Sequence, residues 1–378
     1  MPSLMLRRAR LMAGLCVVST LSLMSAAAAD TLVLQPVGLG AVSGLSDNGR
    51  VAAVVTTDNY EPFRWTAREG LVRLGRDTWG PLGHASGVPA LSADGSVVAA
   101  TILSDDGTYS TAGRWTRAGG WQMLDQPLPV GGGMSDGEDA SVFGMSGDGA
   151  VVTGLFWRPG ASGGYAHGFA WSAPTAMVDM GSSGNSSRID GANRDGSVLV
   201  GWDEHPQYGT RRAAVWVNGV RTVLDSSDWP SEASATNADG TIIVGQAADP
   251  ANAFQEAAVM WKWDGAQWVV SVLGSLNGAH SVDIAYAEGL SDDGSIVVGS
   301  SRPNASKPKS AGFIWTAATG LVDANNYVAA NGGPSNKLVP IIDFAAITPD
   351  GRTIAAVTQA AVAPFGTRSM LIHRRPSP

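Results

Sequence analysis

The sequence predicts an all-β protein, a seven-bladed β-propeller of four-stranded blades. Three observations predict it: a phrase that recurs seven times, a tryptophan that follows most of its copies, and a spare strand ahead of the first copy. The phrase reads small or apolar, Ser/Thr/Asn, any residue, Asp or Asn, Gly. Its copies lie at 45–49, 91–95, 145–149, 192–196, 236–240, 290–294 and 347–351. The glycines are 44 to 57 residues apart, and a strand-rich period of about 50 residues is typical of a propeller.

The sixth unit shows the expected plan of one blade. Residues 285–290 form a short first strand, and the Asp-Gly pair at 293–294 supplies the positive φ of a tight hairpin turn. Residues 295–299 form a second, apolar strand that is suited to burial. After a loop, residues 311–316 form the third strand and 321–323 the fourth.

A tryptophan marks the third strand of six units. It lies 16 to 22 residues after the glycine of the phrase, at Trp65, Trp115, Trp171, Trp216, Trp261 and Trp315. We expect each of these rings to pack between neighbouring blades rather than to bind a ligand. The seventh unit has residues 369–373 at this place, without a tryptophan.

The two ends of the chain predict how the ring closes. The seventh unit stops after its third strand, and residues 31–35 form a strand that no unit uses. We expect this N-terminal strand to pair into the last blade, because closure removes the open edge that the array would otherwise expose. Residues 30–378 are therefore expected to form a single propeller.

The first 29 residues are expected to be a signal peptide. Arg7, Arg8 and Arg10 precede a short apolar stretch, and alanines at 26–29 offer a cleavage site before Asp30. The apolar stretch is short for a membrane span, so we expect no stable membrane insertion. Cys16 is the only cysteine, so the mature chain has neither disulfides nor thiolate metal sites.

The charge of the chain argues against nucleic-acid partners. The formal net charge is −8, and removing the three arginines of the leader makes it −11. Such a surface repels nucleic acid and anionic lipid. We expect a monomer in the periplasm of a Gram-negative bacterium or outside the cell.

Two phrases carry a resemblance to a known family. Ala166-His-Gly-Phe-Ala-Trp171 is close to a His-Ala-Phe-x-Trp phrase, and residues 291–299 follow Ser-x-Asp-Gly-(apolar)-Val-x-Gly. Both resemble the HAF repeat family of exported bacterial proteins, and the likeness covers essentially the whole mature chain. More distantly, the units are similar to WD40 and TolB-type blades, as at 348–355. The resemblance implies export and repetition, but it implies no reaction and no catalytic residues.

The expected ligand-binding face is the one with the long, irregular loops. In a propeller, the Asp-Gly turns lie on one face, whereas the loops between second and third strands and between blades lie on the other, and variable loops on a rigid scaffold often carry function. Aromatic rings with a polar tip suit sugars and peptides. The candidate ligand-binding residues are Trp79, His84, Trp157, Tyr165, Trp202, Asp203, Arg212, Trp229, His280 and Tyr286.

One loop combines the groups that general acid–base catalysis needs. Residues 202–212 include Glu204, His205, Tyr208 and Arg211. His205 and Tyr208 would act as base and acid in a polysaccharide lyase or hydrolase, with Glu204 nearby and Arg211 or Arg212 holding a substrate carboxylate. An ordinary polar loop of ion pairs and caps explains the same residues.

Three functions therefore remain open from the sequence. The first is a binding module for a glycan or a protein, the second a carbohydrate-active enzyme, and the third a structural extracellular repeat protein. No phosphate-binding loop, zinc-protease motif or credible nucleophile elbow is present, and we expect no cofactor and no metal.

Overall fold

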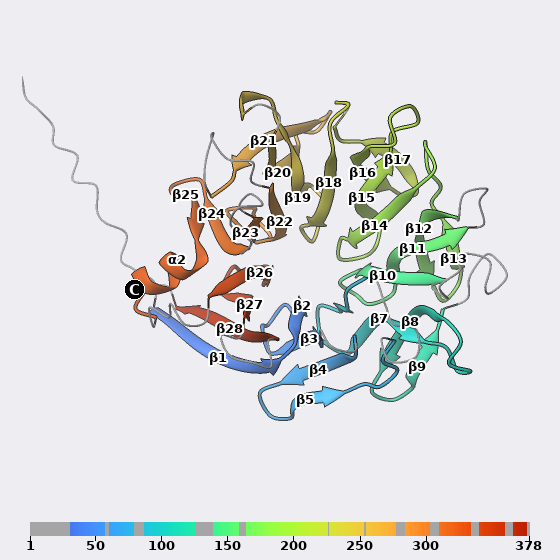
Figure 1. Cartoon of the computed structure of the whole chain (residues 1–378), viewed down its shortest axis with the longest axis horizontal. Coiled ribbons are helices and arrows are strands. Elements are labelled where there is room, and N and C mark those ends of the chain that lie inside the picture. The colour runs from blue at the N-terminus through green and yellow to red at the C-terminus, as the bar shows by residue number, and fades with distance from the viewer. Residues whose placement is uncertain are drawn as a thin grey trace, which may run out of the picture.

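The computed structural model describes residues 31–56, 60–78, 87–124, 139–158, 164–225, 227–252, 255–276, 284–302, 310–333, 340–359 and 366–375. In this part of the chain, seven antiparallel sheets of four strands each are arranged around a centre, as Figure 1 shows. The predicted seven-bladed propeller is confirmed. Trp79, His84 and His280, and the expected signal peptide, lie outside the described residues.

The first three blades follow the expected order of strands, from the centre outward. Blade 1 comprises β2 (Ala41–Leu45), β3 (Val51–Val55), β4 (Pro62–Thr66) and β5 (Gly70–Arg73). Blade 2 comprises β6 (Ala90–Leu91), β7 (Val97–Leu103), β8 (Ser110–Thr116) and β9 (Gly120–Met123). Blade 3 comprises β10 (Ala140–Met145), β11 (Val152–Arg158), β12 (Tyr165–Ser172) and β13 (Ala176–Asp179).

The next three blades repeat this plan. Blade 4 comprises β14 (Ser187–Ala192), β15 (Val198–Glu204), β16 (Arg211–Val217) and β17 (Val220–Val223). Blade 5 comprises β18 (Ser231–Thr236), β19 (Ile242–Asp249), the 3₁₀ turn η1 (Pro250–Asn252), β20 (Gln255–Trp263) and β21 (Trp268–Gly274). Blade 6 comprises β22 (Ile284–Leu290), β23 (Ile296–Arg302), β24 (Ala311–Thr316) and β25 (Gly320–Asp323), followed by helix α2 (Ala324–Ala330).

Blade 7 joins the two ends of the chain. It comprises β26 (Ile341–Ile347), β27 (Thr353–Gln359), β28 (Thr367–Arg375) and, as its outer strand, the N-terminal β1 (Thr31–Leu39). β1 pairs with β28 from Thr31↔Arg375 to Leu39↔Arg368, and the blue and red strands lie side by side in Figure 1. The closure that the sequence predicts is therefore present.

The recurring phrase forms a turn in which its side chains bond to the backbone. In the second unit, the Ser92 hydroxyl donates to Asp94 at 2.7 Å and accepts the buried N–H of Val97 at 2.9 Å, while Asp94 accepts the N–H of Ser96 at 2.9 Å. These bonds lower the pKa of the Asp94 carboxyl. Gly95 has φ +74°, which an L-residue adopts only under strain. The phrase thus specifies its own hairpin.

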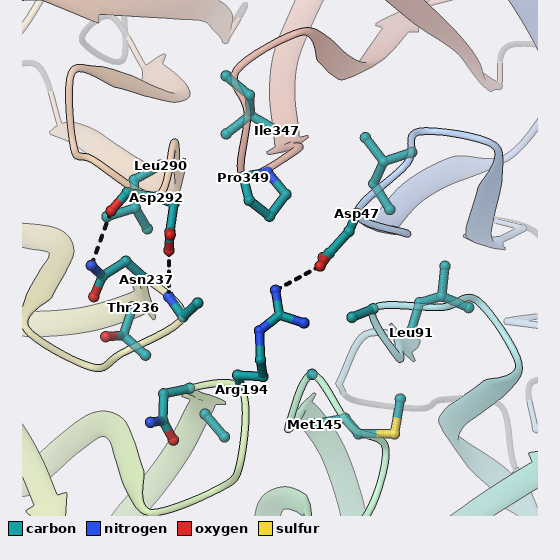
Figure 2. Close-up of a pocket in the computed structure, with 16 residues that line it drawn as sticks. Asp47, Leu91, Met145, Arg194, Thr236, Asn237, Leu290, Asp292, Ile347 and Pro349 are labelled. Atoms are coloured by element: carbon teal, nitrogen blue, oxygen red, sulfur yellow. Dashed lines mark hydrogen bonds and ion pairs between the residues drawn. The ribbon is translucent and has the colours of Figure 1, made fainter.

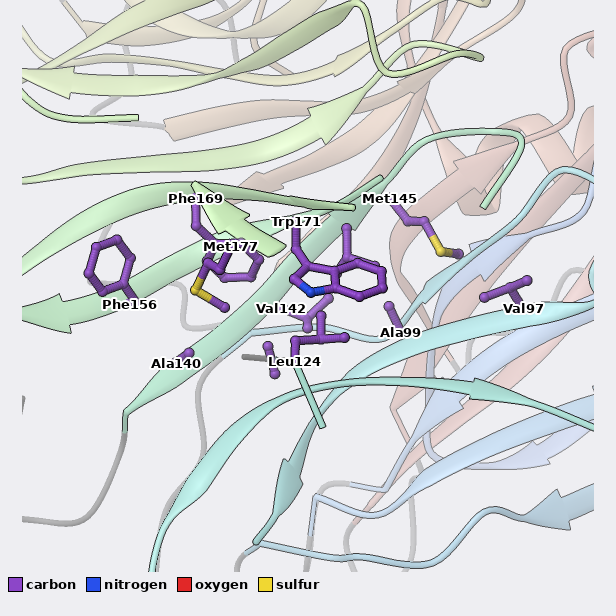
Figure 3. Close-up of a cluster of buried hydrophobic side chains, with 12 residues drawn as sticks. Val97, Ala99, Leu124, Ala140, Val142, Met145, Phe156, Phe169, Trp171 and Met177 are labelled. Carbon is purple, nitrogen blue, oxygen red and sulfur yellow. The ribbon is translucent and has the colours of Figure 1, made fainter. Parts of the chain in front are cut away.

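Tryptophans fill the spaces between blades, as expected. In Figure 3, Trp171 of blade 3 lies among apolar side chains of its own blade and of blade 2, including Val97, Ala99 and Leu124. Trp65, Trp216 and Trp261 are also buried against the preceding blade. Trp115 and Trp315 are only partly buried. Burying a large aromatic side chain is worth about 2–3 kcal/mol, so these layers hold the blades together.

Candidate functional site

A repeated irregularity of the inner strands directs one side chain into the central channel in six of the seven blades. In β2, β10, β14, β18, β22 and β26, one residue two positions before the end of the strand has no partner on the neighbouring strand. Such a β-bulge re-aims the side chain that it carries. These bulge residues are Ser43, Phe143, Asp190, Ser234, Glu288 and Ala345.

The narrow end of the channel is formed by the seven Asp-Gly turns, which enclose a cavity of about 170 Å³. Figure 2 shows Arg194 reaching across this end to Asp47, and the two side chains form an ion pair at 2.7 Å. The backbone N–H of one turn bonds to the next turn at most steps, from Asp47 N–H to Ala93 O at 2.8 Å onward. Pro349 has no N–H, so the step from blade 7 to blade 1 lacks this bond.

The other end of the channel opens as a funnel on the loop-rich face. Its cavity has a volume of about 510 Å³ and is lined from all seven blades. Blades 4 to 7 contribute four carboxyl groups, those of Asp190, Glu232, Glu288 and Asp343. Blades 1 to 3 contribute mainly apolar or small groups, namely Ala41, Val42, Ser43, Val55, Val88 and Phe143. The funnel is therefore acidic on one side and mostly apolar on the other.

An arginine ties two of the carboxylates together. Arg188 Nε donates to Asp190 Oδ1 at 2.5 Å, and its terminal nitrogen pairs with Glu232. Its guanidinium also lies 4.2 Å from the centroid of the Phe143 ring, which favours the cation there. Arg211 reaches the second oxygen of Glu232 at 3.2 Å. Arg188 and Arg211 are thus already engaged.

Glu288 and Asp343 form a second pair of carboxyl groups, which have no ion-pair partner within 4 Å among the described residues. Each carboxyl acts on the pKa of the other, and Glu288 accepts the hydroxyl of Ser300 at 2.8 Å. Arg302, whose guanidinium lies 5.6 Å from the centroid of the Tyr286 ring, is the cation that lowers the pKa of both. Two carboxyls in contact cannot both ionise easily, so they share a proton.

Burial sets the protonation of these groups. It raises the pKa of Asp343 to about 6, and it raises the pKa of Glu288 well above its usual value, with the neighbouring Asp343 adding to the effect. Burial and, less strongly, Glu232 raise the pKa of Asp190 to about 7 against the opposing influence of Arg188. The pKa of Glu256, a neighbour of Glu232, is also raised by burial. The acidic side of the funnel lacks enough positive charge for its carboxyls.

Two carboxyl oxygens of the funnel lack any hydrogen-bond partner among the described residues, Asp190 Oδ2 and Asp343 Oδ1. Asp203 Oδ2, which does not line the funnel, is a third such buried oxygen. The Asp190 side chain is only 9% exposed, yet it lines the cavity. A buried acceptor without a donor costs about 1–3 kcal/mol. Within the described residues, no group of three or more His, Cys, Asp or Glu side chains is arranged to hold a metal ion.

The structure brings only part of the predicted catalytic loop together. The His205 and Tyr208 rings stack with centroids 4.7 Å apart. His205 Nδ1 accepts the backbone N–H of Gln207 at 3.1 Å, and its Nε2 lies 3.7 Å from Asp228. Glu204 instead accepts the Asn185 side chain and backbone, each at 3.2 Å. Arg211 turns toward the funnel through Glu232.

The predicted ligand-binding residues lie in different environments. Tyr286 is next to the funnel, under Arg302, whereas Trp202 is buried beneath Arg211, 4.7 Å from its guanidinium. Asp203 is fully buried and pairs with Arg212 at 3.5 Å and with Arg221 at 3.3 Å. Trp157 and Tyr165 flank the hairpin loop of blade 3 and are partly buried, and Trp229 is exposed.

The sequence-based reasoning did not find the six charged residues of the funnel. These are Arg188, Asp190, Glu232, Glu288, Arg302 and Asp343. A signal was present, because aligning the seven units places Asp190 and Glu288 at the position that Ser43, Ser234 and Ala345 occupy in other blades. Charged residues at a position that is uncharged in the other units indicate a task that the fold itself does not impose.

Comparisons with known proteins define the fold. No protein-family model matches the sequence, and no curated protein matches it. The β-propeller domain of the Trilobed protease from Pyrococcus furiosus, described as having an open velcro topology, is 12% identical over 93% of this chain and 96% of its own, with a TM-score of 0.52. The Cps50 (Swd1) β-propeller domain from Myceliophteria thermophila is 11% identical over 90% and 99%, also with a TM-score of 0.52.

A further solved structure is TolB from Acinetobacter baumannii, with 15% identity and a TM-score of 0.46. The match covers 73% of this chain and 63% of that one. At 11–12% identity, the likenesses to the two propeller domains show the propeller fold and nothing finer. Among the residues that the structure describes, no helix combines the length and the apolar character that a membrane span needs.

Proposed function

We propose that this chain is an exported binding module and that the funnel on its loop-rich face holds a polar group of its ligand, a glycan or a protein. One observation carries the proposal. The funnel buries carboxyl groups, two of whose oxygens have no hydrogen-bond partner among the described residues, beside a cavity of about 510 Å³.

The cost of these groups argues against a purely structural role. Taking a carboxylate out of water costs several kcal/mol unless partners compensate it, and Glu288 and Asp343 share one cation, Arg302, which forms no ion pair with either of them among the described residues. The fold does not require charge at this place, since other blades carry Ser43, Ser234 or Ala345 at the bulge. Partners supplied by a ligand would compensate the charge.

The enzymatic alternative lacks a comparable observation. A general base needs a nitrogen or oxygen that is free to take the proton of the substrate. The Nδ1 of His205 is already occupied by its own loop, and Glu204 bonds to Asn185. The catalytic role of this loop stays a prediction.

The test is a binding screen with a variant that blocks the funnel. Purified mature chain is incubated with panels of polysaccharides and peptides, and retained ligands are identified by mass spectrometry. Ser234→Phe places at one bulge the side chain that the fold already accepts at the equivalent Phe143. Ala150→Phe, on an exposed turn of the opposite face, is the matched control.

We expect the Ser234→Phe variant to lose the ligand and the Ala150→Phe variant to keep it, with both variants folded by circular dichroism. Retention by both would show that the ligand binds elsewhere. Export is tested separately: the mass of the protein recovered from outside the cytoplasm of its native host should correspond to a chain that begins at Asp30.

A further inference from the structure

The arrangement of charge in the funnel allows its ligand to be described more closely, on the basis of the proposed function. We propose that the funnel binds a primary ammonium group on an apolar stem, such as the lysine side chain of a partner protein. The ammonium would contact Glu288 and Asp343, and the stem would lie against the apolar side of the funnel.

The carboxyl groups at the cavity outnumber the arginines that pair with them. Four carboxyl groups line the cavity, those of Asp190, Glu232, Glu288 and Asp343, together with one arginine, Arg302. Arg188 and Arg211 are engaged with Asp190 and Glu232. On the side of blades 6 and 7, two carboxyls therefore share a single cation, Arg302.

Two carboxyl oxygens in the funnel lack hydrogen-bond donors among the described residues. Asp343 Oδ1 and Asp190 Oδ2 are acceptors without donors in the described structure, and the Asp190 side chain is nine-tenths buried. A ligand that satisfies them must donate. An ammonium group has three donors and no acceptor, whereas a sugar hydroxyl or an amide brings acceptors that find few donors on this side of the funnel.

The wall of the funnel opposite the carboxyl pair is mostly apolar. Val42, Val55 and Val88 line it together with Phe143, and Ala345 continues it into blade 7. A hydrocarbon stem loses water against such a surface, which favours its binding there. The long stem of lysine, with its charge at the tip, matches an apolar wall that faces a carboxyl pair.

The proposal predicts that binding releases protons. The groups facing the Glu288–Asp343 pair are Arg302 and Ser300 from β23 and the backbone of Phe344. None of them fully ionises the pair, since burial keeps the pKa of Asp343 at about 6. An ammonium beside it lowers that pKa, so the pair gives up its shared proton. Affinity should then rise as the pH increases from 5 to 8.

The experiment compares two probes that differ only in charge. Nα-acetyl-lysinamide carries the ammonium, and its Nε-acetylated derivative has the same stem without it. Binding to the mature chain is measured by titration calorimetry at pH 6, in two buffers with different enthalpies of ionisation. We expect the charged probe to bind at least tenfold more tightly and to release protons, and its affinity to fall at least tenfold in Asp343→Asn and Ser234→Phe but not in Ala150→Phe.

The outcomes separate this inference from the proposed function. Equal binding of both probes, or no proton release, would overturn the ammonium proposal. If N-acetylglucosamine, added as a neutral probe, binds in place of lysinamide and Ser234→Phe abolishes its binding, the funnel is a binding site for a neutral glycan and only the ligand class is wrong. If neither the probes nor any ligand of the wider screen loses binding in Ser234→Phe, the proposed function itself fails.

Discussion

The glycine of each Asp-Gly turn should be indispensable for two separable reasons, and Gly196 allows both to be measured. Its φ is +75°. An added Cβ would lie 2.5 Å from Val151 Cγ2 and 3.0 Å from Val151 Cβ, in the neighbouring blade. Gly320, in the turn between β24 and β25, has φ +64° but nothing within 4 Å of an added Cβ. Gly320→Ala is therefore a control for the backbone effect alone.

The structure gives the expected magnitudes. Placing alanine in the left-handed region costs about 1–2 kcal/mol, of which the stiffer unfolded chain returns about 0.4–1 kcal/mol. Gly320→Ala should thus lose roughly 1 kcal/mol. Gly196→Ala adds an overpacked contact, which typically costs about 1–3 kcal/mol, so its total loss should be about 2–4 kcal/mol.

The assay is denaturant unfolding followed by tryptophan fluorescence, with the midpoints of variants of equal slope compared. A double variant, Gly196→Ala with Val151→Ala, removes the atoms that the new methyl group meets. We expect it to recover at least about 1 kcal/mol relative to the sum of the single variants. Equal losses for Gly196→Ala and Gly320→Ala, together with strictly additive effects in the double variant, would refute the steric part of the argument.

Three further outcomes follow from the fold and the funnel. Deleting residues 31–39 uncovers the edge of β28 and should lower the melting temperature markedly, with partial recovery when the peptide is added back; an unchanged melting curve would contradict closure. Ser92→Ala leaves the buried N–H of Val97 unpaired and should lower the free energy of unfolding by about 1–3 kcal/mol. Ser96→Ala, at an exposed position of the same turn, should lower it by about half a kcal/mol or less. Similar losses in the two variants would contradict this role of Ser92. The raised pKa of Asp343, about 6, means that the folded state keeps a proton that the unfolded chain loses above about pH 4. Its contribution to stability therefore falls as the pH rises from 4 through 6, and Asp343→Asn should flatten the decline of melting temperature between pH 4 and pH 7; an unaltered slope would assign the effect to other groups.

The scaffold could be predicted from the sequence because its determinants are local and repeated. A seven-fold phrase with Ser, Thr or Asn, then Asp or Asn, then Gly at fixed positions specifies a turn by bonds within about five residues, as between Ser92 and Val97. The tryptophans recur at a spacing that only a layered array explains. The spare strand at 31–35 had a natural partner once the seventh unit was found to be short.

The funnel could not be predicted in the same way, because a bulge decides which side chains line it. In a regular strand, successive side chains point to opposite faces, so sequence position alone would decide which face Asp190 takes. The bulge at Asp190 and at Glu288 shifts that register by one residue, and convergence across blades appears only in space. The loop residues Glu204, His205 and Tyr208 gave a denser chemical signal in the sequence, but their partners lie mostly within the loop itself.

The division of labour within each inner strand has a consequence for how such a molecule changes. Residues such as Val142 and Ile189 pack between blades, whereas their neighbours at the bulge, Phe143 and Asp190, face the channel. The two sets occupy different positions of the same strand. A substitution at the bulge of one blade can therefore change the lining of the channel while the apolar layers between the blades stay intact. The acidic half and the apolar half of the present funnel are one of many linings that this scaffold permits.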